Sequence, residues 1–345
     1  MEYWVKISKY AGMREDLVQA GGGNSAYKIS KDKMVIKASG FQLADVTTKT
    51  GYALVNPLIV KEAFLYCDNL DDINEEKSKR ILSEAFIEGN RPSIETFLHS
   101  ISGRYSLHTH PVVVNAVACQ KNGSKIFKEL YPDALIVPYA TPGVELAKAY
   151  FRAYKEYKSL NEIEPSVVFL LNHGLIVSAE TSDKIIALTE AVVKKLEDYL
   201  QVDMSSYHCI SKLMLLYNDG IIWRVSDENI LSSYRKIGAA WNHCFCPDCV
   251  VFLGKKMYEI KTSEIDRNDY ESFIEKNGYP VVIFYKDNIY IHADSVKKAL
   301  EIQSVLGFSA QVMALNINKE CDLLSESEKN FLLNWDAEKY RRNMI

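Results

Sequence analysis

The stretch PSVVFLLNHGLIVSA, residues 165–179, constrains the fold of this chain more than any other segment. Its two apolar runs, VVFLL and LIVSA, predict two buried strands separated by the polar break Asn172-His173-Gly174. The next segment, residues 181–202, has the apolar spacing of a long amphipathic helix. This part of the chain therefore belongs to a domain that combines strands with helices.

Hydrophobic periodicity predicts further helices and short strands before this stretch. The expected helices cover residues 2–19, 57–67, 72–90, 93–102, 111–120 and 144–157. The expected strands are AYKIS, MVIKA, SLHTH and ALIVPYA, of which the first two form a hairpin that turns at Asp32 and Lys33. Ser93 follows the helix-breaking Pro92 and is expected to cap the helix over residues 93–102.

The chain changes character near residue 215. The segments CVVFLGKK, PVVIFYKDNIYIHA and SVKKALEIQSVLGFSAQVMAL predict a strand, a hairpin that turns at residues 286–288, and a helix. The length of 345 residues also exceeds the size of about 250–300 residues at which single cores stop growing. We therefore expect an α/β protein of two domains, residues 1–215 and a small C-terminal α/β domain of residues 216–345.

Composition argues against several classes of protein. The 41 lysine and arginine residues nearly balance the 45 aspartate and glutamate residues, so nucleic acid is not an expected partner. No apolar run approaches the roughly 18 residues that cross a bilayer, and the charged N-terminal segment does not resemble a signal peptide. We expect a cytoplasmic protein without a membrane anchor, whose seven cysteines, an odd number, are reduced thiols.

Two histidines in SLHTHP, His108 and His110, give the first chemical signal. Residues i and i+2 of a strand point the same way, so both imidazoles would face one point in space and suit a divalent metal such as zinc. His173, in the break between the two apolar runs, is the expected third ligand. An H-x-H pair on an exposed strand is also common without a metal, and the pair alone leaves this alternative open.

A carboxylate and two polar loops accompany these histidines. Glu95 precedes the histidine strand and could transfer protons beside a cation, although a glutamate in a first helical turn is more often a capping residue. The stretch GGGNSAYK offers backbone amides that could hold an anion, but it is neither a Walker loop nor a G-x-G-x-x-G fingerprint. A second turn, KASG, and Ser93 could join it in binding phosphate.

Six motifs in this order, GGGNSAYK, KASG, PSIET, HTHP, VPYATPG and NHG, resemble the class II aldolase/adducin family. The similarity is greatest to the aldolase half of bifunctional rhamnulose-phosphate aldolase/dehydrogenases. It covers about residues 15–200. The segment PDCVVFLG and the ending WDAEKYR extend a weaker similarity into the second domain. The resemblance implies a three-layer αβα domain with a mixed, largely antiparallel central sheet, and a cyclic homotetramer with active sites at subunit boundaries.

The resemblance also implies roles for individual residues. His108, His110 and His173 match the family's zinc ligands, although another divalent metal could replace zinc. Glu95 matches the family's acid/base, and Tyr139 matches a proton donor that reaches the site of a neighbouring subunit.

The resemblance further implies a substrate. The family holds its substrate phosphate at positions matched here by Gly23, Asn24, Ser39, Gly40 and Ser93. Ile94 stands where related aldolases often carry a second serine, so the phosphate pocket is altered. The implied activity is retro-aldol cleavage of a ketose or ketose phosphate through a zinc-stabilised enediolate. Other members epimerise, dehydrate or decarboxylate sugars by the same logic, and a non-catalytic, adducin-like interaction module is a further alternative.

The segment HCFCPDC, residues 243–249, raises the question of a second metal site. Cys246 and Cys249 have C-x-x-C spacing, and His243 and Cys244 lie nearby. Four ligands within one short segment strain a tetrahedral site, since structural zinc normally draws its ligands from two separated pairs, so reduced thiols are expected. The second domain also lacks a glycine fingerprint and, at about 130 residues, is short for a dinucleotide-binding dehydrogenase.

Overall fold

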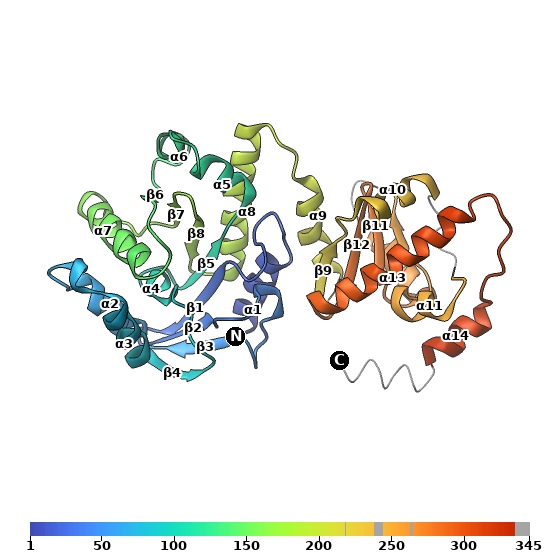
Figure 1. The fold of residues 1–345 in the computed structure, drawn as a ribbon, viewed down its shortest axis with the longest axis horizontal. Coiled ribbons are helices and arrows are strands. Elements are labelled where there is room, and N and C mark those ends of the chain that lie inside the picture. The colour runs from blue at the N-terminus through green and yellow to red at the C-terminus, as the bar shows by residue number, and fades with distance from the viewer. Residues whose placement is uncertain (218, 238–243, 263–264, 335–345) are drawn as a thin grey trace. The chain divides into compact units, whose positions relative to one another are not determined.

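A computed structural model describes residues 1–217, 219–237, 244–262 and 265–334 of the chain. The chain divides into two compact units, unit 1 (Met1–Met204) and unit 2 (Ser205–Ile345), which are drawn together in Figure 1. Helix α9 (Ser205–Leu213) begins unit 2 and packs against its strand β9 (Ile221–Arg224). The domain boundary near residue 215 stays a prediction from the sequence.

An eight-stranded sheet forms the centre of unit 1, in the order β4-β3-β2-β1-β5-β8-β7-β6 (Figure 1). Its strands are β1 (Asn24–Ser30), β2 (Lys33–Lys37), β3 (Tyr52–Val55), β4 (Phe86–Gly89), β5 (Tyr105–Thr109), β6 (Leu135–Val137), β7 (Val167–Leu170) and β8 (Gly174–Ala179). All neighbouring strands are antiparallel except β6 and β7. The mixed, largely antiparallel sheet is therefore confirmed.

Helices cover both faces of this sheet (Figure 1). They are α1 (Glu2–Gly12), α2 (Pro57–Leu65), α3 (Glu75–Ala85), α4 (Thr96–Ser100), α5 (Val112–Ala118), α6 (Gly123–Leu130), α7 (Val144–Leu160) and α8 (Ser182–Leu200), with 3-10 turns η1 (Leu43–Asp45) and η2 (Leu70–Asp72). Phe169 and Leu175 pack in one core with α1 and α8, whereas Val168 and Ile176 pack in a second core with α2 and α7. Alternate strand residues thus enter opposite cores, which makes unit 1 a three-layer αβα domain.

Three local expectations in unit 1 are wrong. The helix expected over residues 72–90 ends at Ala85, and Phe86–Gly89 forms edge strand β4 because it pairs with β3. The first helix ends at Gly12, since glycine is a poor helix former, and does not continue to residue 19. Ser93 does not cap α4: its Oγ accepts a hydrogen bond from the N–H of Glu95, and Glu95 occupies the capping position.

Unit 2 contains a four-stranded sheet in the order β10-β11-β12-β9. Its remaining elements are η3 (Met214–Leu216), α10 (Glu228–Ile237), α11 (Pro247–Leu253), β10 (Tyr258–Ile260), α12 (Arg267–Asn277), β11 (Val282–Tyr285), β12 (Asn288–Ala293), α13 (Val296–Leu315) and α14 (Glu326–Asn334). The expected hairpin is present as β11 and β12, and its turn places Lys286 and Asp287 at positive φ. The expected helix after it is α13.

The run CVVFLGKK, expected as a strand, forms helix α11 instead. Pro247 occupies the first helical turn, where its fixed φ suits a helix, and Gly254 at φ +82 ends it. Periodicity alone cannot distinguish a short buried strand from a short buried helix, so the proline was the stronger signal in this segment.

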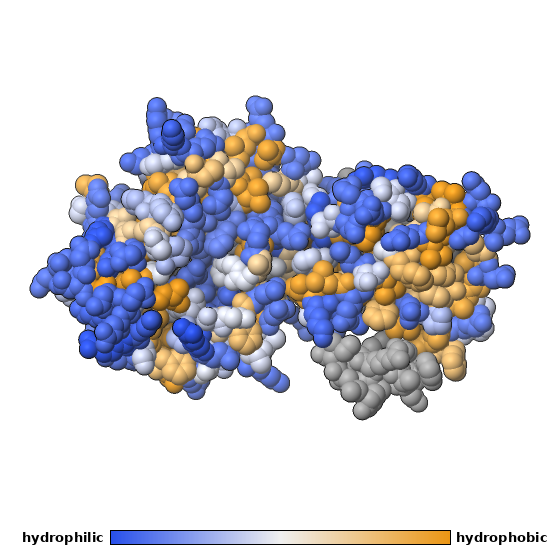
Figure 2. All heavy atoms as spheres, viewed as in Figure 1, coloured by the Kyte–Doolittle hydropathy of each residue, from blue (hydrophilic) through white to orange (hydrophobic). Residues whose placement is uncertain are grey.

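Helix α13 carries apolar side chains on its exposed face as well as on the face that it buries. Ile302 and Leu306 are buried, whereas Leu300, Phe308 and Leu315 are exposed. Figure 2 shows hydrophobic residues gathered over α13 and its surroundings in unit 2. No helix within the described part of the chain is long and apolar enough to cross a membrane.

Candidate metal centre

Three histidines from two distant parts of the sequence meet at one end of strand β5. His108 lies in β5, His110 follows its end, and His173 lies in the turn between β7 and β8. Strand β5 pairs antiparallel with β8, with Thr109 opposite Leu175. The end of β5 therefore lies beside the start of β8, which brings His173 next to a histidine 65 positions earlier in the chain.

The imidazole rings converge through their Nε2 atoms. Nε2 of His108 lies 3.0 Å from Nε2 of His110 and 3.1 Å from Nε2 of His173. Nitrogen ligands about 2.0 to 2.1 Å from a tetrahedral zinc ion would lie about 3.3 Å from one another. The spacing therefore fits one small divalent cation. These histidines, together with Glu95, are called the metal centre below.

The backbone determines which nitrogen of His108 can bind a ligand. Nδ1 of His108 lies 3.0 Å from the carbonyl oxygen of Leu175. A carbonyl oxygen can only accept, so Nδ1 carries the proton and donates it, and Nε2 of the neutral ring keeps its lone pair. One lone pair cannot satisfy two neighbouring rings by hydrogen bonding, whereas a cation would accept the lone pairs of all three.

Burial keeps the three imidazoles neutral. It lowers the pKa of His110 to about 4 and lowers the pKa values of His108 and His173 below their ordinary value. Repulsion from neighbouring histidines lowers the pKa values of His108 and His110 further. Neutral imidazole is the form that binds a metal, so the centre presents three metal-binding nitrogens at neutral pH.

Gly174 and Gly23 allow the backbone to pass close to these histidines. A Cβ atom on Gly174 would lie 2.3 Å from the carbonyl oxygen of Thr109 and 3.0 Å from Cδ2 of His110. Gly23 has φ +72, and its Cβ would lie 2.9 Å from the carbonyl oxygen of His108. A side chain at either position would displace the histidine strand.

Glu95 brings a carboxylate to the same point. Its Oε1 lies 3.6 Å from Nε2 of His108, and its side chain is 19% exposed. Oε2 is buried and has no hydrogen-bond partner among the described residues. Burial raises the pKa of Glu95 to about 7, and the charge of Lys37 counteracts part of this shift. The carboxylate can therefore exchange a proton near neutral pH.

The sequence placed Lys37 in the turn KASG but did not predict its burial or its effect on Glu95. Lys37 ends strand β2, is buried, and donates a hydrogen bond from Nζ to the carbonyl oxygen of Phe41 at 2.6 Å. Burial lowers the pKa of Lys37, while the charge of Glu95 raises it. The available signal was a lysine that continues the apolar run MVI, where a charged residue needs a partner.

A model of the class II aldolase and adducin N-terminal domain matches residues 4–200, which is more than half of the chain. The chain belongs to this family. The matched residues lie within unit 1 and include all four residues of the metal centre.

Several known proteins are similar to part of this chain. The uncharacterized oxidoreductase YuxG of Bacillus subtilis is 27% identical over 216 residues, which cover 58% of this chain and 29% of YuxG. The chain thus spans less than a third of that relative. The N-terminal class II aldolase domain of a protein from Thermoplasma acidophilum has 22% identity and a TM-score of 0.49, covering 57% of this chain and 92% of that chain. L-fuculose-1-phosphate aldolase from Thermus thermophilus has 16% identity and a TM-score of 0.38, covering 58% and 96%.

Three loops, the first of which runs into strand β1 at Asn24, carry the residues that were matched to the family's phosphate site. They contain Gly23, Asn24, Ser39, Gly40 and Ser93. Asn24 lies opposite His108 in the paired strands β1 and β5, and its Nδ2 donates to the carbonyl oxygen of Lys37 at 3.4 Å. The N–H of Ser39 donates to the carbonyl oxygen of Arg91 at 2.9 Å. The fold therefore joins the three loops beside the metal centre.

Tyr139 lies just beyond β6, the edge strand. Strands β8 and β7 separate β6 from β5, and the carbonyl oxygen of Val137, at the end of β6, accepts from the N–H of Leu171 in the turn that carries His173. Its side chain is 61% exposed. Its hydroxyl is therefore displayed at the surface of unit 1.

Residues 244–249, the described part of the cysteine segment of unit 2, do not form a comparable group. Among the described residues, the group of at least three histidine, cysteine or acidic side chains able to share a metal is the histidine triad. The Sγ atoms of Cys246 and Cys249 lie 3.5 Å apart. His243 and the ending WDAEKYR lie outside the described residues, so the structure does not test them.

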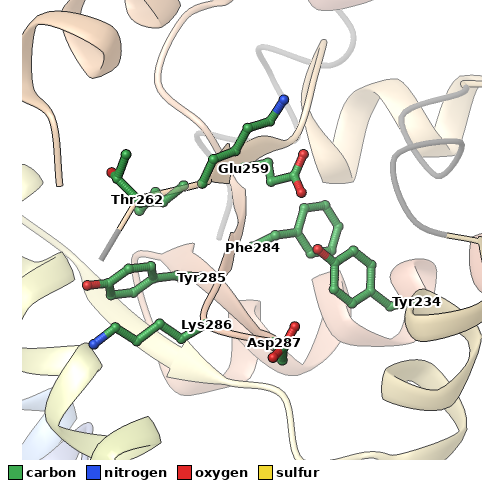
Figure 3. A pocket seen from close by; sticks show the side chains of 9 residues that line it. Tyr234, Glu259, Thr262, Phe284, Tyr285, Lys286 and Asp287 are labelled. Atoms are coloured by element: carbon green, nitrogen blue, oxygen red, sulfur yellow. The ribbon is translucent and has the colours of Figure 1, made fainter. Parts of the chain in front are cut away.

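Unit 2 also has a pocket of about 450 Å³ at the C-terminal ends of the parallel strands β10 and β11 (Figure 3). The rings of Tyr234 and Phe284 stack with their centroids 4.2 Å apart. Figure 3 shows Glu259 and Asp287 near these rings, with Tyr285 farther away. The described lining residues include no histidine or cysteine, so this pocket does not offer the ligands of the metal centre.

Proposed function

We propose that this member of the class II aldolase family is a metal-dependent aldehyde-lyase that cleaves a ketose or ketose phosphate by a retro-aldol reaction. The observation that carries the proposal is the meeting of three neutral imidazoles and one half-buried carboxylate at a single point. A buried set of titratable groups with shifted pKa values is typical of a reaction site. An interaction module would not need this set.

The three histidines would hold the metal. Zinc is favoured because it prefers imidazole nitrogen, although another divalent metal could take its place. When bound, the cation would supply Lewis-acid stabilisation of the negative charge that develops on the ketose oxygens during cleavage. The hydrogen bond from His108 to Leu175 would orient the His108 ring for this purpose.

Glu95 would move the proton at the carbon that becomes the nucleophile. A general acid or base works best when its pKa lies near the operating pH, and the pKa of Glu95 is about 7. Because Oε2 has no hydrogen-bond partner among the described residues, it can accept a proton without first giving up another bond.

The loops beside the metal centre would bind the substrate's phosphate or hydroxyl groups. Gly23, Asn24, Ser39, Gly40 and Ser93 are the proposed contacts. The buried Oδ1 of Asn24 has no hydrogen-bond partner within the described structure, so it remains able to accept a bond from a ligand. Ile94 contributes no hydroxyl group, so both phosphorylated and unphosphorylated sugars belong to the proposed substrate class.

Tyr139 would act in a second copy of the chain, as proton donor to the leaving aldehyde oxygen. Its exposure at the edge of the sheet supports a role outside its own subunit. A homotetramer with sites at subunit boundaries, which the family resemblance implies, would provide that arrangement.

The narrower similarity to the aldolase half of rhamnulose-phosphate aldolase/dehydrogenases is also part of the proposal. The match to 29% of YuxG, which is named an uncharacterized oxidoreductase, supports a relationship to one portion of a longer protein. The proposed catalytic residues all lie in unit 1.

Metal content and cleavage products test the function. The full chain should purify with, or take up, a stoichiometric divalent metal, and should cleave one of a panel of ketoses and ketose phosphates to a three-carbon ketone and an aldehyde. The His173→Ala variant should lose cleavage and bind metal more weakly by over about 100-fold, beyond the usual effect of outer-shell changes. Epimerisation or dehydration without cleavage would contradict the lyase. A chain that takes up no metal would favour an interaction module.

A further inference from the structure

Unit 2 contains a pair of cysteines that the proposed lyase chemistry does not use. Cys246 directly precedes helix α11, and Cys249 lies in its first turn. Their Sγ atoms lie 3.5 Å apart, and both are free thiols. Two residues separate them in the chain, so the local conformation of one turn sets their proximity.

The two thiols differ in access. Cys246 is half-buried, whereas Cys249 is 1% exposed. Burial, with a smaller contribution from Cys246, raises the pKa of Cys249 to about 12. A dissolved reagent can therefore reach Cys246 first, and Cys249 is protected until Cys246 has reacted.

We propose that Cys246 and Cys249 form a reversible intramolecular disulfide by exchange with a small-molecule disulfide such as glutathione disulfide. The Cys246 thiolate attacks one sulfur of the reagent, its S–S bond breaks, and one glutathione thiolate leaves. The sulfur of Cys249, having released its proton, then attacks the sulfur of Cys246 and displaces the second glutathione. Two protein thiols are oxidised and one disulfide is reduced to two thiols, so electrons and protons balance.

The geometry favours this disulfide over a metal site. The sulfur atoms need to approach by about 1.5 Å to reach the S–S bond length near 2.05 Å. The nearby Cys244 has its Sγ 4.0 Å from the carbonyl oxygen of Gly254, and it does not form a three-ligand group with the other two sulfurs. Two sulfurs alone do not complete a structural zinc site.

Titration of the full chain with mixtures of glutathione and glutathione disulfide tests the proposal. After alkylation of the remaining thiols, mass spectrometry should show the peptide with Cys246 and Cys249 unalkylated at both and lighter by two hydrogen atoms. Dithiothreitol should restore both thiols. The exposed Cys119 and Cys321 serve as internal references for reagent access.

Variants assign the partners. Cys246→Ser should prevent the bridge, Cys249→Ser should stop the reaction at a mixed disulfide on Cys246, and Cys244→Ser should react like the unaltered chain. A lasting mixed disulfide on Cys246 in the unaltered chain would overturn the inference. So would an unreactive pair while Cys119 reacts, or zinc that stays bound to these thiols in the His173→Ala variant. Because this readout is independent of sugar cleavage, its failure and that of the proposed function are distinguishable.

Discussion

Unit 1 buries two groups of polar side chains and satisfies them in opposite ways. In the first, called here the arginine cluster, Arg14 donates to Asp16 at 2.7 and 2.6 Å and to Glu190 at 2.8 Å. The hydroxyl of Tyr10 also donates to Glu190. In the metal centre, by contrast, three neutral nitrogens crowd together, and Oε2 of Glu95 has no hydrogen-bond partner among the described residues.

The difference separates a structural role from a chemical one. Burial alone would lower the pKa of Arg14, but its hydrogen bonds to Asp16 raise it above the ordinary value, so the guanidinium stays charged. Burial instead shifts Glu95 and the histidines towards their neutral forms. A paired charge cannot easily take a new partner, whereas neutral groups with unused lone pairs can bind a ligand.

The arginine cluster also positions the metal centre. The carbonyl oxygen of Leu17 accepts from the N–H of His110, and that of Asp16 accepts from the N–H of Val112, each at 2.8 Å. Asp16 is therefore held by Arg14 through its side chain and supports the end of the histidine strand through its backbone. The comparison predicts that changes in the metal centre will act mainly on cleavage, and that changes in the arginine cluster will act mainly on the free energy of unfolding.

The largest effect should come from Glu95→Gln. This change keeps the shape of the side chain and removes its ability to exchange a proton, so kcat for ketose cleavage should fall about 10²- to 10⁴-fold. Stability and metal content should remain close to those of the unaltered chain. Steady-state kinetics and metal analysis would measure both.

Glu88→Gln, on the exposed edge strand β4, is the matched control and should leave kcat unchanged. Full activity of Glu95→Gln would show that another group moves the proton.

Arg14→Met should act on stability. It leaves the buried carboxylate of Asp16 without its main partner, which should lower the free energy of unfolding by about 3–5 kcal/mol in denaturant titrations. Lys6→Ala breaks the exposed pair with Asp183 and should cost less than about 1 kcal/mol. The double change Arg14→Met with Asp16→Leu should recover much of the loss. If the double variant were no more stable than the single one, an unpaired buried charge would not be the cause.

Local sequence patterns predicted much of what surrounds the metal centre. Strands β5, β7 and β8 were expected because alternation and apolar runs are properties of neighbouring residues. The shared direction of His108 and His110 followed from the two-residue period of a strand. These steps need no knowledge of the rest of the fold.

Long-range pairing explains what the patterns could not supply. The position of His173 beside His108 depends on the register between β5 and β8, for which no local pattern exists. The interactions of Lys37 with the carbonyl oxygen of Phe41 and with the charge of Glu95 likewise have no local pattern in the sequence. The metal and catalytic roles of these residues stay predictions, whereas their proximity is a property of the fold.

Gly174→Ala should lower both the stability of unit 1 and its affinity for metal. The added methyl group would lie 2.3 Å from the carbonyl oxygen of Thr109, so β8 must shift away from β5, at a cost of about 1–3 kcal/mol in unfolding free energy. The shift should also weaken metal binding, which calorimetric titration would measure. Gly21→Ala is the matched control, because a Cβ there meets nothing within 4 Å. Equal stability of the two variants would show that the sheet accommodates the methyl group.

The effect that is smallest at neutral pH concerns His99, a buried residue of helix α4. Its Nδ1 lies 2.6 Å from Oγ of Ser106, and burial, with repulsion from Lys28, lowers its pKa to about 3. The unfolded chain binds a proton at His99 near pH 6.5, whereas the folded chain does so only near pH 3. Stability should therefore fall as the pH drops from 6.5 towards 3, by up to about 1.4 kcal/mol per pH unit, and His99 should contribute no slope above that window.

His99→Gln should remove this part of the pH dependence. Unfolding free energies of both proteins, measured at several pH values under the same metal conditions, cancel the contributions of His108 and His110, because both proteins retain them. Below pH 6.5, the slope of the unfolding free energy against pH should be steeper for the unaltered chain. The difference should reach up to about 1.4 kcal/mol per pH unit, which corresponds to one bound proton. Parallel curves would mean that His99 binds its proton equally well in the folded and unfolded chains, so that the interior around His99 would hold a charge as the arginine cluster does.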